Sequence, residues 1–191
     1  MCNKMLLNIS EATLEEKIIF QNLMQYYLYE FSAISDIELD DRGRYPYIFL
    51  DCYWSEDDRH PYLIRVDGKL AGFALLRRGT FFPDQRSVDR PGMLVAEFFI
   101  LRALRRQGIG ARSAVNLFKR FPGRWEIGQQ ASNYHGQAFW RTVIGNYCGD
   151  KYGEYDLDNE HWCGPVQVFN NSYFHEGEPT SRGDCLPLNH E

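Results

Sequence analysis

Residues 93–110 read Met-Leu-Val-Ala-Glu-Phe-Phe-Ile-Leu-Arg-Ala-Leu-Arg-Arg-Gln-Gly-Ile-Gly, and this stretch decides the fold. Residues 93–101 form the most apolar run of the chain, which predicts a strand near the middle of a sheet. Residues 108–121 follow with apolar positions at helical spacing, and Pro122-Gly123 ends the predicted helix. We therefore expect a buried strand, a glycine-containing turn and a helix in direct succession.

The predicted turn suits an anion. Gly108 and Gly110 let the backbone approach a ligand closely, because neither carries a Cβ. The first turn of the helix offers unpaired N–H groups and the positive end of the helix dipole. Arginines surround the turn at positions 102, 105, 106 and 112, although the formal net charge of the chain is −5. A phosphate or pyrophosphate ligand is the expected occupant.

Two common nucleotide motifs do not fit. Gly123 and Gly128 have the spacing of a Walker loop, but Gln129 and Gln130 follow instead of Lys and Ser or Thr. A dinucleotide-binding turn needs a third glycine three residues after Gly110, where this chain has Ser113. The turn therefore points to another phosphate-containing ligand.

The rest of the chain predicts an α/β (α+β) domain with a mixed, mostly antiparallel central sheet flanked by helices. Strands are expected at residues 5–9, 61–66, 69–78, 125–130 and 164–170, and helices at residues 15–31, after Ser10 as N-cap, and 133–147. Asp67-Gly68 is a tight-turn dipeptide that joins two of the strands as a hairpin. Residues 79–92 are predicted to form a loop. The domain is expected to span residues 1–170, and residues 171–191 are expected to form a polar tail.

Composition excludes several classes of protein. Of the 191 residues, 44% are hydrophobic and 15% aromatic, which is typical of a globular domain. The net negative charge disfavours a general nucleic-acid binder. No apolar run reaches the length of a membrane span, and the first residues do not resemble a signal peptide. We therefore expect a cytoplasmic protein with no nucleic-acid or membrane partner, and the sequence leaves both a monomer and a homodimer open.

The cysteines indicate neither a disulfide framework nor a metal site. Their number, five, is odd, and none forms a Cys-x-x-Cys pair, so reduced thiols are expected. Cys163 with His161, and Cys185 with His190, match no strong zinc spacing. No metal is expected.

Two segments together resemble the GNAT family of N-acetyltransferases. Arg105-x-x-Gly108-x-Gly110, directly after an apolar strand, is similar to the Arg/Gln-x-x-Gly-x-Gly/Ala signature of that family. Asn133, with Gly136, Ala138, Phe139 and Trp140 after it, resembles the family's later Asn-x-x-Ala-x-x-Leu/Phe-Tyr segment. The resemblance covers roughly residues 5–170 and is strongest over residues 93–145. It implies the acyl-CoA N-acyltransferase fold and acetyl-CoA as co-substrate.

The resemblance also implies where acetyl-CoA binds. In the family the pyrophosphate lies on the backbone of the glycine turn, and the pantetheine arm pairs with the end of the central strand, beside a splay from the next strand. Carried over to this chain, the cofactor-binding residues are Phe99, Ile100, Leu101, Arg105, Arg106, Gln107, Gly108, Ile109, Gly110, Ala111, Asn133 and Trp140. Asn133 has a second interpretation as a helix N-cap.

The implied reaction is the attack of a neutral amine on the thioester, which needs a base because the amine is protonated near pH 7. Glu97 interrupts the apolar strand on the same face as Phe99 and Leu101, where burial would raise its pKa. Its alternative role is to pair with a nearby arginine. Glu126 is the second candidate. Some relatives carry a glutamate five residues before the asparagine, where this chain has Gly128, and Glu126 lies two residues earlier on the same strand face.

The sequence departs from the family at Trp140, where many relatives carry a tyrosine that protonates the leaving thiolate. An indole N–H does not titrate usefully. Either Tyr134 or Tyr147 serves as the acid, or the thiolate leaves unaided.

The acceptor is expected to be an amine of a small molecule or peptide. The aromatic residues of the first helical region and its following loop are Tyr26, Tyr27, Tyr29, Phe31, Tyr45 and Tyr47, and the acidic ones are Asp36, Glu38, Asp40 and Asp41. Together they suit a cationic acceptor, or they are core aromatics beside a solvated loop. Two rival functions stay open: a non-catalytic acyl-CoA sensor, and an acyltransferase that uses a longer acyl group.

Overall fold

The computed structural model describes residues 5–82, 84–160 and 162–172. Within them the strands are β1 (Leu7–Glu11), β2 (Arg59–Val66), β3 (Lys69–Gly79), β4 (Gly92–Ile100), β5 (Arg124–Gly128), β6 (Tyr152–Asp158) and β7 (Cys163–Asn170). The α-helices are α1 (Lys17–Phe31), α2 (Gln85–Asp89), α3 (Ile109–Arg120) and α4 (Tyr134–Cys148). Short 3₁₀ helices are η1 (Leu14–Glu16), η2 (Asp51–Trp54) and η3 (Arg102–Leu104). Residues 173–191 of the predicted tail lie outside the described residues.

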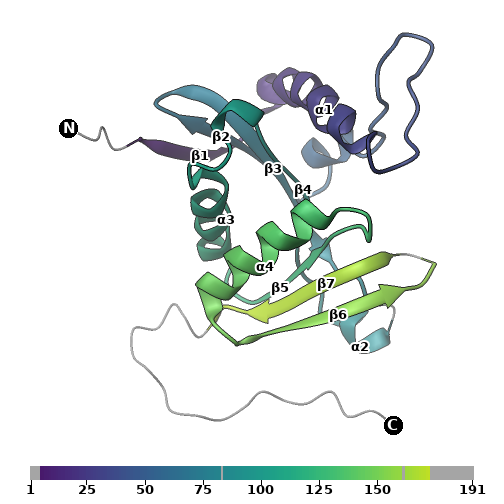
Figure 1. Cartoon of the computed structure of the whole chain (residues 1–191), viewed down its shortest axis with the longest axis vertical. Coiled ribbons are helices and arrows are strands. Elements are labelled where there is room, and N and C mark those ends of the chain that lie inside the picture. The colour runs from purple at the N-terminus through teal and green to yellow at the C-terminus, as the bar shows by residue number, and fades with distance from the viewer. Residues whose placement is uncertain (1–4, 83, 161, 173–191) are drawn as a thin grey trace.

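The strands form one sheet in the order β1-β2-β3-β4-β5-β7-β6. The pairs β1–β2, β2–β3, β3–β4, β5–β7 and β6–β7 are antiparallel, and β4–β5 is parallel. The predicted mixed, mostly antiparallel sheet is therefore confirmed. In Figure 1, β2, β3 and β4 lie between α1 and α3, while α4 lies beside β5, β7 and β6.

The two halves of the sheet separate at its centre. Among the described residues, β4 and β5 pair only at Met93 with Trp125 and at Leu94 with Glu126. Beyond these pairs β4 runs on to Ile100 and β5 to Gly128. This divergence, called the splay below, leaves the β5-facing edge of β4 with backbone groups that the sheet does not pair.

A bulge in β4 changes which face its side chains occupy. Leu75 of β3 pairs with Glu97, but Leu76 pairs with Val95, so Ala96 has no partner in β3. An extra residue of this kind puts neighbouring side chains on the same face and bends the strand. Accordingly, Ala96 packs with the α1 core, and its neighbour Glu97 contacts Tyr27 of α1 on the same side of the sheet.

Each face of the sheet carries its own apolar core. On one side Phe20, Leu23 and Met24 of α1 pack with Phe73 and Phe99 of the sheet. On the other side α3 and α4 pack through the buried residues Leu117, Phe118, Trp140, Val143 and Ile144. The two layers hold β4 at the centre of the molecule, with the splay next to it.

Three local predictions were wrong. Ser10 lies in β1, and the helical turn begins after Thr13, whose backbone N–H donates to Glu16 Oε2 at 3.2 Å. Residues 79–92 contain α2, whose N-cap Asp84 accepts a hydrogen bond from the Ser87 N–H. Strand β6 was missed, because Tyr-Gly-Glu-Tyr-Asp-Leu-Asp is largely exposed at the sheet edge and carries no apolar alternation.

None of the helices in the described residues is both long enough and apolar enough to cross a bilayer.

Candidate functional site

The glycine turn is an open helix N-terminus. Gly108 is the N-cap of α3 with φ of 75°, and Arg106 before it has φ of 60°. The first bond of the helix runs from the Arg112 N–H to the Gly108 carbonyl at 3.0 Å. The N–H groups of Ile109, Gly110 and Ala111 precede that bond, so they lie at the positive end of the helix without intrahelical acceptors.

Gly110 lies where three elements meet. A Cβ added there would be 3.2 Å from Cε2 of Phe139 in α4 and 3.6 Å from Cγ1 of Ile100 in β4. Phe139 also stacks on Phe98 of β4, with ring centroids 5.8 Å apart. The start of α3, the end of β4 and the first half of α4 therefore come together at the glycine turn.

Arg105 is tied to the protein itself. Its Nε donates to the Ile100 carbonyl at 2.8 Å, and a terminal N–H donates to Glu30 Oε2 of α1 at 2.6 Å. The guanidinium lies 5.6 Å from the centre of the Phe99 ring. Arg106 is exposed. The structure thus gives Arg105 a role in holding the turn and leaves Arg106 accessible to an anion.

The predicted cofactor strand lies beside the turn. Phe99 and Ile100 are buried on opposite faces of the sheet, and the Leu101 N–H donates to the Ala71 carbonyl at 2.8 Å. Gln107 donates from Nε2 to the Ala103 carbonyl at 3.1 Å, which closes the loop between strand and helix. The cofactor-binding residues predicted between positions 99 and 111 therefore lie along one segment, which runs from the end of β4 through the loop to the first turn of α3.

The two predicted cofactor residues of α4 have structural roles. Asn133 is the N-cap of α4, and its Oδ1 accepts from the Gly136 N–H at 2.9 Å. Trp140 is buried, with its ring 5.2 Å from Phe98 and 4.9 Å from Phe139. The N-cap interpretation of Asn133 is confirmed, and acetyl-CoA contacts by Asn133 and Trp140 stay predictions.

Glu97 is held by two tyrosines. Glu97 lies in the part of β4 that is no longer paired with β5, on the α1 side of the sheet. Its side chain is partly buried. Tyr27 of α1 donates its hydroxyl to Glu97 Oε2, and Tyr47 donates to Oε1 at 3.0 Å. The sequence also left open a pairing of Glu97 with a nearby arginine. The structure does not show this pairing, because both carboxylate oxygens of Glu97 accept hydrogen bonds from phenols.

The surroundings of Glu97 shift its protonation. Burial raises the pKa of Glu97 to about 7, and the hydrogen bonds from Tyr27 and Tyr47 oppose that rise. Burial and the charge of Glu97 in turn raise the pKa of Tyr27 and Tyr47, so both remain protonated donors. A carboxylate that titrates near neutral pH can accept a proton and return it.

Glu126 has very different surroundings. Its side chain is fully buried on β5, and it accepts from the Thr80 hydroxyl at 3.0 Å, the Phe81 N–H at 2.8 Å and Arg124 Nε at 2.8 Å. Both oxygens are therefore occupied by protein donors. This carboxylate fixes the chain after β3 onto β5.

Glutamine at position 126 is expected to destabilise the fold. The Glu126→Gln protein loses the ion pair with Arg124 and an acceptor for Thr80 or Phe81, which costs about 1–3 kcal/mol of unfolding free energy. Urea denaturation measures this. Glu154→Gln, which changes a partly exposed ion pair with Arg141, is the control and costs about 0–1 kcal/mol. Equal stability of the Glu126→Gln protein and the wild type would contradict this assignment.

The aromatic and acidic residues after α1 divide into two groups. Tyr27 and Tyr47 face Glu97, whereas Tyr26 and Tyr29 are mainly exposed. Phe31 packs on Tyr27, and the Tyr45 hydroxyl donates to Ser32 Oγ at 3.3 Å. Asp36, Glu38 and Asp41 are exposed, and Asp40 pairs with Arg44 at 3.3 Å. Neither the interpretation as a pocket for a cationic acceptor nor the interpretation as core aromatics beside a solvated loop describes all of these residues.

The loop after α1 contacts the loop between β5 and α4. The Ser35 hydroxyl donates to Gln130 Oε1 at 2.6 Å, and the Ser132 hydroxyl donates to the Ile34 carbonyl at 3.0 Å. Gln137 of α4 holds the second loop through its Nε2, which donates to the Gln130 and Ala131 carbonyls at 3.1 Å. The segment after α1 is thereby joined to the half of the sheet on the far side of the splay.

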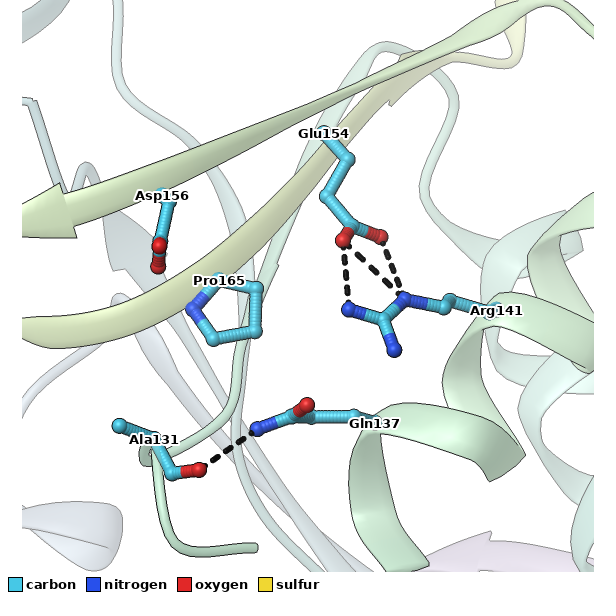
Figure 2. Close-up of a pocket in the computed structure, with 6 residues that line it drawn as sticks. All are labelled: Ala131, Gln137, Arg141, Glu154, Asp156 and Pro165. Carbon is cyan, nitrogen blue, oxygen red and sulfur yellow. Dashed lines mark hydrogen bonds and ion pairs between the residues drawn. The ribbon is translucent and has the colours of Figure 1, made fainter. Parts of the chain in front are cut away.

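A cavity of about 230 Å³ lies between α4 and the strands β6 and β7. It is lined by Ala131, Gln137, Arg141, Glu154, Asp156 and Pro165. Figure 2 shows Arg141 paired with Glu154 at one side and Gln137 reaching the Ala131 carbonyl at the other. None of the predicted catalytic or cofactor-binding residues lines this cavity.

Some of the cysteines and histidines of the chain lie within the described residues. Within residues 5–82, 84–160 and 162–172, no group of three or more His, Cys, Asp or Glu side chains could hold a metal ion. Cys52, Cys148 and Cys163 are free thiols. His161, Cys185 and His190 lie outside the described residues.

Comparison with known families agrees with this arrangement. Residues 20–145 match the family described as "Acetyltransferase (GNAT) family". The chain belongs to the GNAT acetyltransferase family. This GNAT domain is thus an acyltransferase by family, as its sequence predicted. A comparison with curated proteins found no match.

Solved structures show the same fold. A GNAT acetyltransferase from Staphylococcus aureus Mu50 superposes with a TM-score of 0.57 at 15% identity, covering 86% of this chain and 99% of that one. The aminoglycoside acetyltransferase AAC(6')-Ib, in complex with ribostamycin and coenzyme A, gives 0.65 at 9% identity, with 92% and 99% covered. The aminoglycoside acetyltransferase meta-AAC0020, from an uncultured soil metagenomic sample and in complex with sisomicin, gives 0.56 at 14% identity, with 82% and 95% covered.

The sequence did not reveal that Tyr27 and Tyr47 bind Glu97. They are 70 and 50 residues away along the chain, and the contact depends on how α1 and its loop pack on the sheet. The aromatic character of the region was visible in the sequence. Only the fold could single out these two phenols from their neighbours.

Proposed function

We propose that this GNAT domain transfers an acetyl group from acetyl-CoA to a primary amine of a small molecule or peptide, with Glu97 as general base. The observation that carries the proposal is the position of Glu97. It is a partly buried carboxylate of β4 in the splay, with a pKa of about 7, on the strand that leads into an open glycine turn. Glu126 is the weaker candidate, because both of its oxygens are taken by Thr80, Phe81 and Arg124.

The chain's own groups supply three functions. Ile109, Gly110 and Ala111 offer N–H groups to a pyrophosphate at the positive end of α3. The unpaired edge of β4 offers backbone groups to a pantetheine arm and donors to a developing oxyanion. Glu97 accepts the proton of the acceptor ammonium, so that the neutral amine can attack. When bound, acetyl-CoA supplies the thioester that the amine attacks.

The leaving thiolate needs no assigned acid. Trp140 is buried at the position of the family tyrosine and has no titratable group. Tyr147 packs against Phe118 and Phe169 in the apolar core, and burial raises its pKa. Tyr134 is exposed at the start of α4. Because a thiol has a pKa of about 8.5, its thiolate is a fair leaving group, and we propose that it departs without a protein acid while the second proton of the amine nitrogen is lost to solvent.

A small polyamine is the acceptor class that we favour, inside the cytoplasm. Structural neighbours are described as aminoglycoside acetyltransferases, and some were solved with ribostamycin or sisomicin bound, which supports a small-molecule amine. Exposed Asp36, Glu38 and Asp41 on the loop after α1 favour a cationic molecule. A homodimer is compatible with this proposal.

The test is release of free thiol from acetyl-CoA in the presence of a panel of amines, including aminoglycosides, diamines and lysine peptides. Wild type, Glu97→Gln and Glu126→Gln are compared. Turnover with at least one amine supports the proposal. Tight binding of acetyl-CoA without turnover on any amine would identify an acyl-CoA sensor, and a preference for longer acyl-CoA would identify a different acyl donor.

The rate should depend on the protonation of Glu97. Because a base acts as its carboxylate, kcat/KM should fall about tenfold per pH unit below the pKa of about 7 and level off above it. The measurement is a pH profile with an amine whose own pKa is determined separately. The Glu97→Gln protein should lack this acid limb; if the limb persists there, another group produces it.

A further inference from the structure

We propose that Tyr47 is a positioning residue that orients the Glu97 carboxylate and couples the loop between α1 and η2 to the base. The inference rests on the proposed role of Glu97. Tyr47 is the only group of that loop among the described residues that donates a hydrogen bond to Glu97.

The two oxygens of Glu97 are held from different parts of the fold. Tyr27 belongs to α1 and is buried among aromatic rings, including Phe73 and Phe99. Tyr47 belongs to the loop and reaches Oε1 at 3.0 Å. With one phenol on each oxygen, the plane of the carboxylate is fixed relative to the splay. A base must lie within hydrogen-bond reach of the proton it accepts, so this orientation matters for transfer.

The loop is docked on α1 close to Tyr47. Gln25 of α1 accepts from the Tyr45 N–H at 2.8 Å, and its Nε2 donates to the Tyr45 carbonyl at 3.0 Å. Ser35 and Ile34, at the other end of the loop, contact the β5–α4 loop across the splay. Tyr47 therefore reaches Glu97 from a loop that is seated on α1 and that also contacts the far side of the splay.

The contact has a definite electrostatic sign. A phenol that donates to a carboxylate stabilises the charged form, so it lowers the pKa that burial raises. Tyr47 itself stays protonated across the physiological range, because burial raises its own pKa. The other titratable groups near the cluster are Tyr27, Tyr53 of η2, Arg59 of β2 and Arg77 of β3. Loss of the Tyr47 hydroxyl therefore shifts the Glu97 equilibrium towards the uncharged acid.

The experiment measures Glu97 directly. The carboxyl carbon of Glu97 is followed by NMR across a pH titration of the full chain, in wild type, Tyr47→Phe and Tyr45→Phe. Tyr47→Phe should raise the pKa of Glu97 by about one unit, a tenfold change in its ionisation constant. Tyr45→Phe is the matched control, because the Tyr45 hydroxyl lies on the same loop and bonds Ser32 instead.

Turnover supplies the second measurement. In Tyr47→Phe the acid limb of the kcat/KM profile should move to higher pH together with the Glu97 titration. In Tyr45→Phe the Glu97 titration should stay at its wild-type pH. Tyr27→Phe should shift Glu97 in the same direction from the α1 side, which keeps the test valid if one variant folds poorly. An unshifted Glu97 titration in Tyr47→Phe, or an equal shift in Tyr45→Phe, overturns the inference. A shifted titration with no amine acetylation at any pH would instead refute the proposed reaction.

Discussion

Replacing Glu97 by glutamine is expected to lower kcat by about 10²–10⁴-fold, the usual contribution of a general base. Glutamine has nearly the same shape, and its single carbonyl oxygen can still accept from one of the two phenols, Tyr27 or Tyr47, while its NH2 group faces the hydroxyl oxygen of the other. What it cannot do is accept the proton of the acceptor ammonium. Steady-state thiol release with the best amine of the panel measures the loss.

Two controls separate loss of the base from loss of the site. Acetyl-CoA affinity, measured by calorimetry, should change less than about threefold, and Glu126→Gln should lose far less of its kcat. The folded Glu97→Gln protein should not be less stable at pH 8. Because the folded-state pKa is raised from 4.5 to about 7, the stabilisation from Glu97 is complete below pH 4.5 and is lost as pH rises through 7. Wild-type turnover by Glu97→Gln at neutral pH would show that another group is the base.

Much of the fold could be predicted because it is encoded locally. The run of residues 93–101 is apolar on both faces because β4 lies between two cores, and the helix after Gly108 starts where its glycine allows a left-handed N-cap. The hairpin at Asp67-Gly68 joins β2 and β3 as the dipeptide predicted. Strand β6 was not predicted, because an edge strand with exposed faces needs no apolar pattern.

The candidate site could be predicted less completely, because it depends on contacts between distant segments. The sequence placed Glu97 on the same face as Phe99, and the structure agrees, since Tyr27 contacts both. The bulge at Ala96 was not predicted, because it follows from the pairing of β4 with β3. Glu126 was the second candidate base from its sequence position, and its donors Thr80, Phe81 and Arg124 are evident only in the fold. Hydrogen-bond partners of a carboxylate are a property of packing, which strand alternation alone does not specify.

Alanine at Gly108 is expected to weaken acetyl-CoA binding by about tenfold or more. Gly108 has φ of 75°, a left-handed conformation that costs other L-residues about 1–2 kcal/mol. No atom within 4 Å would clash with the new methyl group, so the effect comes from the backbone. Relaxation of the turn would misalign the N–H groups of Ile109, Gly110 and Ala111, and a tenfold loss of affinity corresponds to about 1.4 kcal/mol. Calorimetry with coenzyme A measures it.

Gly123 provides the matched control. It also has a positive φ, 125°, and open space around its Cβ, but it lies beyond the other end of α3, away from the turn. Gly123→Ala should therefore lose a similar amount of unfolding free energy and bind coenzyme A with wild-type affinity. Gly145→Ala, within α4 and also open, should bind normally and be slightly more stable, since alanine favours helix over glycine. Gly108 shapes the N-terminus of α3, whereas Gly123 does not. If Gly108→Ala bound coenzyme A as tightly as Gly123→Ala, the pyrophosphate would therefore not lie on this turn.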